Sequence, residues 1–339
     1  MALHQQYALV RSEAGFNLEQ QSQELGALHP RQLRIKVKAA SLNYRDLLTF
    51  NDPAGSKDGL VPLSDAAGEV VEIGSEVRKW KIGDRVSPGF FPAWTDGAFS
   101  QSNLSNALGG GQTDGVLSEF ITADEAAVVA IPDHLGFHEA AALPCAGVTA
   151  WHALFERGKI QPEQTLLVQG TGGVALLGLQ LATAIGARVI VISSSDEKLA
   201  RAKALGAWQT INYKSQPDWD QVALELTDDR GVDHILELGG PSTYDRSIAA
   251  IAPGGQIAQI GVLSGFGSRP DMTPLQFKNA AVNGICVGSV AHYANLNRFL
   301  RKHRIHPVID ADIPFENAGT AYEMLRSAGH FGKITISVG

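Results

Sequence analysis

This sequence of 339 residues has little cysteine, no long apolar run and no excess of positive charge. Its two cysteines, Cys145 and Cys286, are too few for a disulfide framework or for a four-thiolate zinc lobe. No apolar run reaches the roughly 18 residues of a membrane span, and no basic segment precedes an apolar stretch near the start. We therefore expect a protein without membrane segments, located in the cytoplasm.

The charge balance is mildly acidic, with a formal net charge of −7. This balance argues against nucleic acid or an anionic membrane as the main partner, because both carry negative charge. The composition is otherwise ordinary for a folded protein, at 44% hydrophobic and 19% charged residues. We expect a small-molecule substrate, and the length allows two domains.

A glycine-rich turn between an apolar strand and an apolar helix is the most informative feature that is present. It reads GxGxxA, with Gly170, Gly172 and Ala175 at the fingerprint positions of dinucleotide-binding folds. Gly170 permits a sharp turn, Gly172 lets a pyrophosphate approach the N–H groups at the helix start, and small Ala175 allows close helix–strand packing. The expected cofactor contacts in the turn are Gly170, Thr171, Gly172, Gly173 and Val174. A tight turn without a ligand is the alternative interpretation.

The end of the strand that follows indicates which dinucleotide fits. NAD enzymes usually place an acidic residue there for the ribose 2′-hydroxyl, whereas this chain has Ser193. Ser194 and Lys198 follow, and hydroxyl donors with a cation suit the 2′-phosphate of NADP. We therefore predict NADP, bound as NADPH, in preference to NAD. Under the alternative interpretation Ser195 or Asp196 only caps the next helix, although capping and phosphate binding are compatible.

The order of predicted elements indicates two kinds of domain. From residue 169 to 262 strands and helices alternate, which is typical of a parallel doubly wound sheet. Ligands bind such sheets at the carboxyl ends of the strands, so Gly239, Gly261 and Val262 are further expected cofactor contacts. Before about residue 135 the period-two alternation predicts a largely antiparallel β domain. The apolar stretch Ile285–Val290 predicts one more strand.

Several motifs together resemble the medium-chain dehydrogenase/reductase superfamily over the whole chain. They are Asn43-Tyr-Arg-Asp, Ala66-Ala-Gly-Glu-Val-Val-Glu-Ile-Gly, Gly83-Asp-Arg-Val, the GTGGVA turn and the closing Gly332-Lys333. The chain looks most similar to the zinc-free quinone oxidoreductase-like branch. The resemblance implies an α/β fold: a GroES-like β-rich catalytic domain at residues 1–140, a Rossmann domain with a doubly wound parallel sheet at residues 141–288, and a return to the catalytic domain at residues 289–339. It also implies a homodimer that pairs through the apolar stretch Val282–Val290.

The same resemblance argues against a catalytic zinc ion. Asn43 and Ser64 stand where zinc-dependent relatives have cysteine and histidine ligands, and only Cys145 matches the third ligand position. One thiolate, with Asp65 beside it, does not supply the three protein ligands that a catalytic zinc takes. We therefore predict no metal, and a hydride acceptor that is either electrophilic itself or polarised by hydrogen-bond donors.

Quinones and α,β-unsaturated carbonyl compounds are such acceptors. The expected catalytic residues are Asn43, Tyr44 and Arg45: Asn43, Tyr44 or Arg45 would stabilise charge on the carbonyl oxygen, and solvent or Tyr44 would supply a proton. Alternatively, Asn43 and Asp46 cap the following helix and Arg45 pairs with an acid.

The resemblance also places three residues near the nucleotide: Thr149, Tyr213 and Lys333. Their structural alternatives are a helix-facing hydroxyl, a strand-end aromatic ring and a surface lysine. The function expected from the sequence is thus an NADP-dependent, quinone oxidoreductase-like reductase. An alcohol dehydrogenase or carbonyl reductase is one alternative, and a protein that binds NADPH without catalysis is another.

Overall fold

The computed structural model describes residues 3–13, 15–267 and 270–339. The chain divides into unit 1, residues up to 148 together with 287–339, and unit 2, residues 149–286. The domain boundaries expected from the sequence lie after residues 140 and 288, and the structural division lies after residues 148 and 286.

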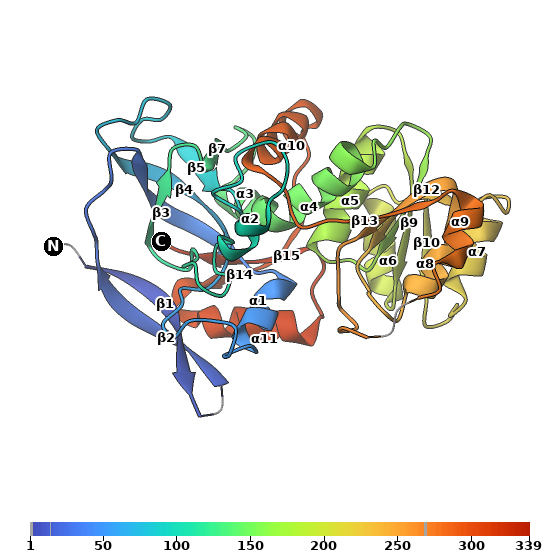
Figure 1. Ribbon diagram of the computed structural model, residues 1–339, viewed down its shortest axis with the longest axis horizontal. Coiled ribbons are helices and arrows are strands. Elements are labelled where there is room, and N and C mark those ends of the chain that lie inside the picture. The colour runs from blue at the N-terminus through green and yellow to red at the C-terminus, as the bar shows by residue number, and fades with distance from the viewer. Residues whose placement is uncertain (1–2, 14, 268–269) are drawn as a thin grey trace. The chain divides into compact units, whose positions relative to one another are not determined.

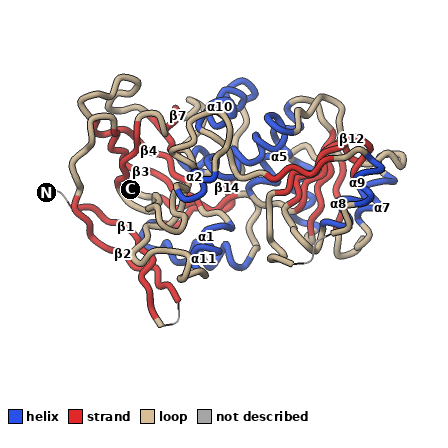
Figure 2. The backbone as a smooth tube through the Cα atoms, viewed as in Figure 1, coloured by secondary structure: helices blue, strands red, loops and turns tan. Residues whose placement is uncertain are grey.

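Unit 2 is built on a parallel sheet. Figure 2 shows strands of this sheet in red around β12, with helices in blue beside them. Among the described residues the sheet has six strands in the order β10-β9-β8-β11-β12-β13. The strands are β8 (Thr165–Gln169), β9 (Arg188–Ser193), β10 (Gln209–Asn212), β11 (Val232–Glu237), β12 (Ile251–Gln259) and β13 (Ala281–Gly284). Every residue of the two central strands, β8 and β11, is buried, although β11 includes the polar residues Asp233, His234 and Glu237. The strand order reverses between β8 and β11, and doubly wound sheets bind ligands at that point.

Helices connect these strands: α5 (Gly173–Ala184), α6 (Asp196–Ala204), α7 (Trp219–Glu225), α8 (Tyr244–Ala250) and α9 (Thr273–Lys278). Two more helices, α4 (Val148–Trp151) and η2 (His152–Arg157), precede β8. Leu167, Ile190 and Ile235 are fully buried in the core of unit 2. The strand–helix alternation predicted from the sequence is confirmed.

The strand predicted over Ile285–Val290 is wrong. The observed strand β13 ends at Gly284, and Val287 takes a positive φ of 50° that a strand does not allow. Ser289 then caps a helix, because its hydroxyl accepts a hydrogen bond from the N–H of His292 at 3.1 Å. This helix, α10 (Val290–His303), belongs to unit 1.

Unit 1 is mainly β structure. Its larger sheet runs β14-β15-β3-β4-β5-β7, with β6 paired to β3, and a hairpin forms a second sheet. The strands are β1 (Leu3–Ser12), β2 (Gly15–Glu24), β3 (Gln32–Ser41), β4 (Asp65–Ile73), β5 (Arg85–Pro88), β6 (Phe120–Asp124), β7 (Val128–Ala130), β14 (Ile309–Pro314) and β15 (Lys333–Ser337). Because β15 pairs antiparallel with β3, the C-terminal part of the chain completes the sheet that its N-terminal part begins.

Short helices complete unit 1. They are α1 (Tyr44–Phe50), α2 (Gln101–Ser105), α3 (Phe137–Ala141), η1 (Leu143–Gly147), α10, η3 (Phe315–Asn317) and α11 (Ala318–Ser327). Figure 1 shows α1 beside α11, and the rings of Phe50 and Tyr322 pack at a centroid distance of 5.5 Å. Across residues 3–13, 15–267 and 270–339, every helix is too short or too polar to cross a membrane.

Candidate functional site

The turn after β8 leaves open space against its backbone. Gly170 has φ of +79°, which favours glycine, and its N–H bonds the carbonyl of Ile192 at 2.7 Å. Gly172 has an ordinary φ of −81° and caps α5. A Cβ atom at either glycine would meet nothing within 4 Å. Packing therefore does not require a glycine at 172, whereas a phosphate held against the free N–H groups of α5 would require one.

Close packing between α5 and the sheet depends on two small residues. The sequence singled out Ala175, which is fully buried. The structure adds Gly178, where a Cβ would overlap the side chain of Leu236 on β11. The sequence signal was present, since residues three apart lie on one face of a helix.

A buried carboxylate organises the neighbouring strand end, and sequence reasoning missed it. Glu237, the last residue of β11, is fully buried. Its Oε1 accepts hydrogen bonds from the N–H groups of Gly239 and Gly240, both at 3.0 Å, and from the hydroxyl of Thr243. Its Oε2 accepts from Gln169 Nε2 at 2.7 Å and from a serine hydroxyl. The network thus joins the ends of β8 and β11, where the strand order reverses.

This network holds two of the expected cofactor residues in place. The N–H of Gly239 also bonds Gln169 Oε1 at 2.9 Å. The N–H of Gly261 bonds the carbonyl of Glu237 at 3.0 Å, and a Cβ at Gly261 would overlap the Leu238 carbonyl. Val262, next in the chain, is half-buried. These residues follow β11 and β12 at the same edge of the sheet as the glycine turn.

The residues predicted for the ribose lie at the ends of β9 and β10. Ser193 is buried, and its carbonyl accepts the N–H of Tyr213, whose side chain is 41% exposed. Ser195 caps α6, because its hydroxyl accepts the N–H of Lys198 at 3.3 Å. Asp196 accepts a hydrogen bond from Asn212 at 2.7 Å. The capping interpretation of Ser195 is therefore observed, and it leaves Ser193, Ser194, Lys198 and Tyr213 as predicted phosphate contacts.

Two residues of the predicted nucleotide site are buried. Thr149 lies in α4 and Thr171 lies in the glycine turn, with exposed fractions of 3% and 6%. The burial of Thr149 fits two interpretations equally well: a hydroxyl that faces its own helix, and a hydroxyl that contacts the nucleotide.

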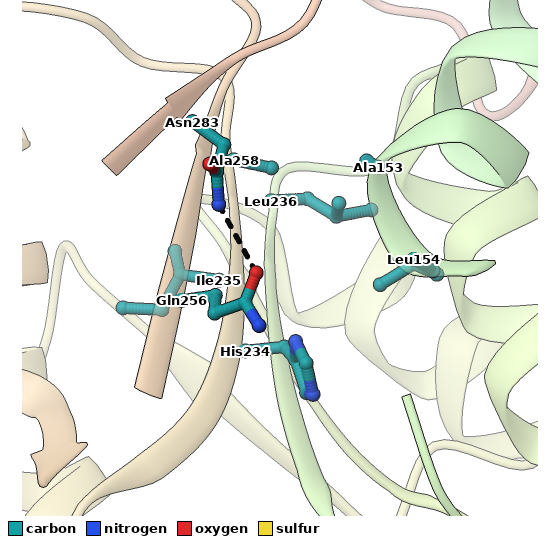
Figure 3. A pocket seen from close by; sticks show the side chains of 8 residues that line it. All are labelled: Ala153, Leu154, His234, Ile235, Leu236, Gln256, Ala258 and Asn283. Carbon is teal, nitrogen blue, oxygen red and sulfur yellow. Dashed lines mark hydrogen bonds between the residues drawn. The ribbon is translucent and has the colours of Figure 1, made fainter. Parts of the chain in front are cut away.

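A small cavity in unit 2 is not a substrate site. It has a volume of about 10 Å³, room for about one water molecule. Figure 3 shows its polar lining: Asn283 donates to Gln256 at 3.0 Å, and His234 lies beside them. His234 also bonds Gln164 at 3.0 Å, and burial lowers the pKa of its imidazole.

In unit 1 the motif Asn43-Tyr-Arg-Asp begins α1. The N–H of Asn43 donates to Asp46 Oδ2 at 2.7 Å, so these two residues form the helix cap that one sequence interpretation expected. Asp46 is almost fully buried, and burial raises its pKa to about 6, against the nearby positive charge of Arg45. Among the described residues, Asn43 Nδ2, Asp46 Oδ1 and the Tyr322 hydroxyl have no hydrogen-bond partner. Such buried, unsatisfied groups cost about 1–3 kcal/mol each, so they require an explanation.

Lys333 reaches the same place from the other end of the chain. It is 4% exposed, so the surface-lysine alternative is wrong. Its ammonium donates to the carbonyl of Leu42 and, at 2.6 Å, to Asn43 Oδ1. Because Leu42 and Asn43 are 291 and 290 positions away, no sequence pattern could have shown these contacts.

The other two expected catalytic residues differ in their surroundings. Arg45 donates through Nη1 to the carbonyl of Leu108 at 2.7 Å, and the same atom lies 3.5 Å from Asp46 Oδ1. Its guanidinium carbon lies 5.0 Å from the ring centre of Phe90, a cation–π arrangement. Tyr44 is 37% exposed. Arg45 is thus held in place by three neighbours, while the Tyr44 ring is accessible to solvent.

Few side chains of the zinc-binding type lie at the position where the resemblance implies that zinc-dependent relatives hold their metal. Asp65 is fully buried and accepts the Ser64 hydroxyl at 2.6 Å and the N–H of Cys145 at 3.1 Å. Burial, and then the charge of Asp65, raise the pKa of the Cys145 thiol well above its ordinary value. The amide oxygen of Asn43 is already bonded to an ammonium. No group of three or more His, Cys, Asp or Glu side chains that could hold a metal occurs within the described ranges. The residues present therefore do not fit a catalytic zinc, which takes three protein ligands.

Known proteins resemble the chain across both units. The alcohol dehydrogenase GroES-like domain matches residues 29–133, and the zinc-binding dehydrogenase family matches residues 173–302. A zinc-type alcohol dehydrogenase-like protein of Schizosaccharomyces pombe is 40% identical over 319 residues, 92% of each chain. A quinone oxidoreductase of Pseudomonas aeruginosa is 33% identical over 240 residues, 70% of this chain and 66% of that one. A crystal structure from Sinorhizobium meliloti, provisionally described as an alcohol dehydrogenase, is 40% identical, with a TM-score of 0.93 over 99% of both chains.

Proposed function

The chain belongs to the medium-chain dehydrogenase/reductase superfamily and is an NAD(P)-dependent oxidoreductase, and from this premise we propose that it uses NADPH, without zinc, to reduce quinones or α,β-unsaturated carbonyl compounds. The observation that carries the proposal is the polar centre of unit 1, which consists of Asn43, Arg45, Asp46, Cys145 and Lys333. It offers hydrogen-bond donors and an ammonium where zinc-dependent relatives have metal ligands.

The glycine turn and the strand ends of unit 2 support the nucleotide part of the proposal. The open space at Gly170 and Gly172 suits a pyrophosphate at the start of α5, and Gly239 and Gly261 line the same sheet edge. Ser193 replaces the acidic residue that would repel a 2′-phosphate, which favours NADPH. When bound, NADPH supplies the hydride.

Residues of unit 1 supply the remaining chemistry. Asn43 and Arg45 would donate hydrogen bonds to the acceptor oxygen, where negative charge develops as hydride adds to carbon. Tyr44, which solvent can reach, would pass a proton from water to the reduced product. Asp46 holds the N–H of Asn43 and so fixes the start of the segment that carries all three.

A binding titration tests the cofactor assignment. Protein treated with a chelator is titrated with NADPH and, separately, with NADH, and the quenching of tryptophan fluorescence is followed. We expect NADPH to bind at least about tenfold more tightly, a difference of roughly 1.4 kcal/mol. Equal affinities, or tighter binding of NADH, would show that Ser193 to Lys198 only begin a helix.

A turnover assay tests the acceptor. We expect NADPH oxidation with quinones or enones, at a rate that chelators do not change and with no zinc retained by the purified protein. The name of the Schizosaccharomyces pombe relative favours the alternative of a zinc-dependent alcohol dehydrogenase, whereas that of the Pseudomonas aeruginosa relative favours a quinone oxidoreductase. That alternative predicts one zinc per chain and alcohol oxidation that a chelator abolishes. NADPH binding without turnover on any acceptor would favour a non-catalytic protein.

The homodimer and the cytoplasmic location stay predictions from the sequence.

A further inference from the structure

We infer that Lys333 is a positioning residue of the reduction site: its buried ammonium fixes the amide of Asn43 and the start of α1, the segment that carries Tyr44 and Arg45. The inference rests on the proposed function and concerns how its donors are held. It differs from the role that the resemblance implied, in which Lys333 contacts the nucleotide.

The backbone at Lys333 is itself fixed. Gly332 has φ of +99°, and a Cβ there would overlap the carbonyl of Val308, so the chain needs glycine at that point. The N–H of Lys333 bonds the same carbonyl at 3.0 Å. From there β15 runs antiparallel beside β3, which leads directly into Leu42 and Asn43. The side chain that bonds the start of α1 therefore comes from a paired strand and not from a loop.

The ammonium determines which way the Asn43 amide faces. A lysine ammonium only donates hydrogen bonds, so the amide atom 2.6 Å from it is the oxygen. The amide nitrogen of Asn43 then faces away from Lys333, and it has no hydrogen-bond partner among the described residues. Because the backbone N–H of Asn43 is held by Asp46, both ends of the residue are fixed and one donor is left for a ligand.

The charge of Lys333 also acts on the groups around Asn43. It lowers the pKa of the Asp46 carboxyl and of the Cys145 thiol, in each case against the larger opposing effect of burial. The positive charge of Lys333 thus acts on both acidic groups, the Asp46 carboxyl and the Cys145 thiol. A neutral side chain of similar length would leave the Leu42 carbonyl and the Asn43 oxygen without their donor.

Substitution of Lys333 separates the two roles, because they affect different constants. We expect Lys333→Met to bind NADPH within about threefold of the wild-type Kd, while kcat falls at least tenfold. Asn43→Asp keeps an acceptor for Lys333 and removes the amide donor, so it should show the same pattern. The double variant Lys333→Met with Asn43→Asp should be no slower than the slower single variant, because Lys333 acts through the amide donor of Asn43, which Asn43→Asp has already removed. Lys333→Arg keeps the positive charge and should fold like the wild type. Its kcat should lie between those of Lys333→Met and the wild type.

The matched control is Lys38→Met. Lys38 lies in β3 of the same unit, and its ammonium is exposed and bonds the carbonyl of Gly339. This change removes the same charge and should leave kcat unaltered. Hydrogen exchange of residues 44–50, measured by mass spectrometry, should quicken in Lys333→Met and not in Lys38→Met.

The results that overturn the inference are distinct from those that overturn the proposed function. A tenfold or larger rise in the NADPH Kd of Lys333→Met at unchanged kcat would make Lys333 a nucleotide ligand. Independent, multiplicative losses in the double variant, or unchanged exchange of residues 44–50, would equally reject a positioning role. Failure of the proposed function appears instead as wild-type protein that reduces no quinone or enone, and the exchange measurement then still decides the role of Lys333.

Discussion

Asp46→Asn should stabilise the protein more at neutral pH than in acid. Asp46 is 2% exposed, and burial raises its pKa to about 6, from an ordinary value of 3.8. The folded protein therefore holds the proton more tightly than the unfolded chain does. Wild-type stability is lost as the pH rises from about 4 to about 6 and stays low above that range. An amide cannot ionise, so the variant avoids this loss.

The magnitude follows from the two pKa values. Each unit of pKa corresponds to 1.36 kcal/mol, so ionising Asp46 in the folded protein costs about 3 kcal/mol more than in the unfolded chain. Part of that cost is already present at pH 4.5, where the unfolded carboxyl has begun to ionise. Between pH 4.5 and pH 7.5 the advantage of the variant should grow by about 2 kcal/mol. The amide oxygen can still accept the N–H of Asn43, so the helix cap remains.

The assay is urea unfolding of both proteins at the two pH values, followed by tryptophan fluorescence. The difference between variant and wild type is compared across pH, because every other titrating group then cancels. Asp133→Asn is the control, since Asp133 is exposed and the same charge is removed at the surface. A difference between Asp46→Asn and wild type that is the same at both pH values would refute the reasoning.

Predictions for four further variants concern unit 2. Gly172→Ala should weaken NADPH binding at least tenfold while changing stability by less than about 1 kcal/mol, because its Cβ meets no protein atom. Gly231→Ala should instead destabilise the protein and leave NADPH affinity unchanged, since the φ of Gly231 is +87° and the added Cβ would lie 2.6 Å from a backbone carbonyl oxygen. NADPH titration and urea unfolding of both glycine variants check this pair of predictions. Equal effects of the two variants on affinity and stability would contradict them. Glu237→Gln should destabilise the protein by about 1–3 kcal/mol for each donor left unpaired, and an unfolding midpoint like that of wild type would show that the network is dispensable. His234→Gln should reduce the change in unfolding free energy between pH 7 and pH 5. Burial lowers the pKa of His234, so the unfolded chain takes up the proton first and wild-type stability falls as the pH drops. Urea unfolding that shows the same pH dependence for variant and wild type would contradict this.

Local chemistry explains why much of unit 2 could be predicted. The glycine turn, the strand before it and the helix after it are contiguous, and their conformations follow from residues a few positions apart. The wrong strand prediction at Ile285–Val290 also concerns local chemistry, that is, residues a few positions apart. The apolar residues of this stretch favour a strand, but the Ser289 cap and the positive φ of Val287 end the strand early. Capping by a serine next to an apolar run was the signal that could have corrected the prediction.

The sequence by itself determined the order of elements, the glycine turn, the residues that replace zinc ligands and the family resemblance, because each of these is written in neighbouring residues or in fixed motifs. Only the tertiary structure decided that Glu237 joins two strand ends and that Lys333 bonds Asn43. Those contacts link residues 68 and 290 positions apart. A buried charge takes whatever partners the fold brings to it, since leaving it unpaired is costly, and no local pattern specifies which partners these are.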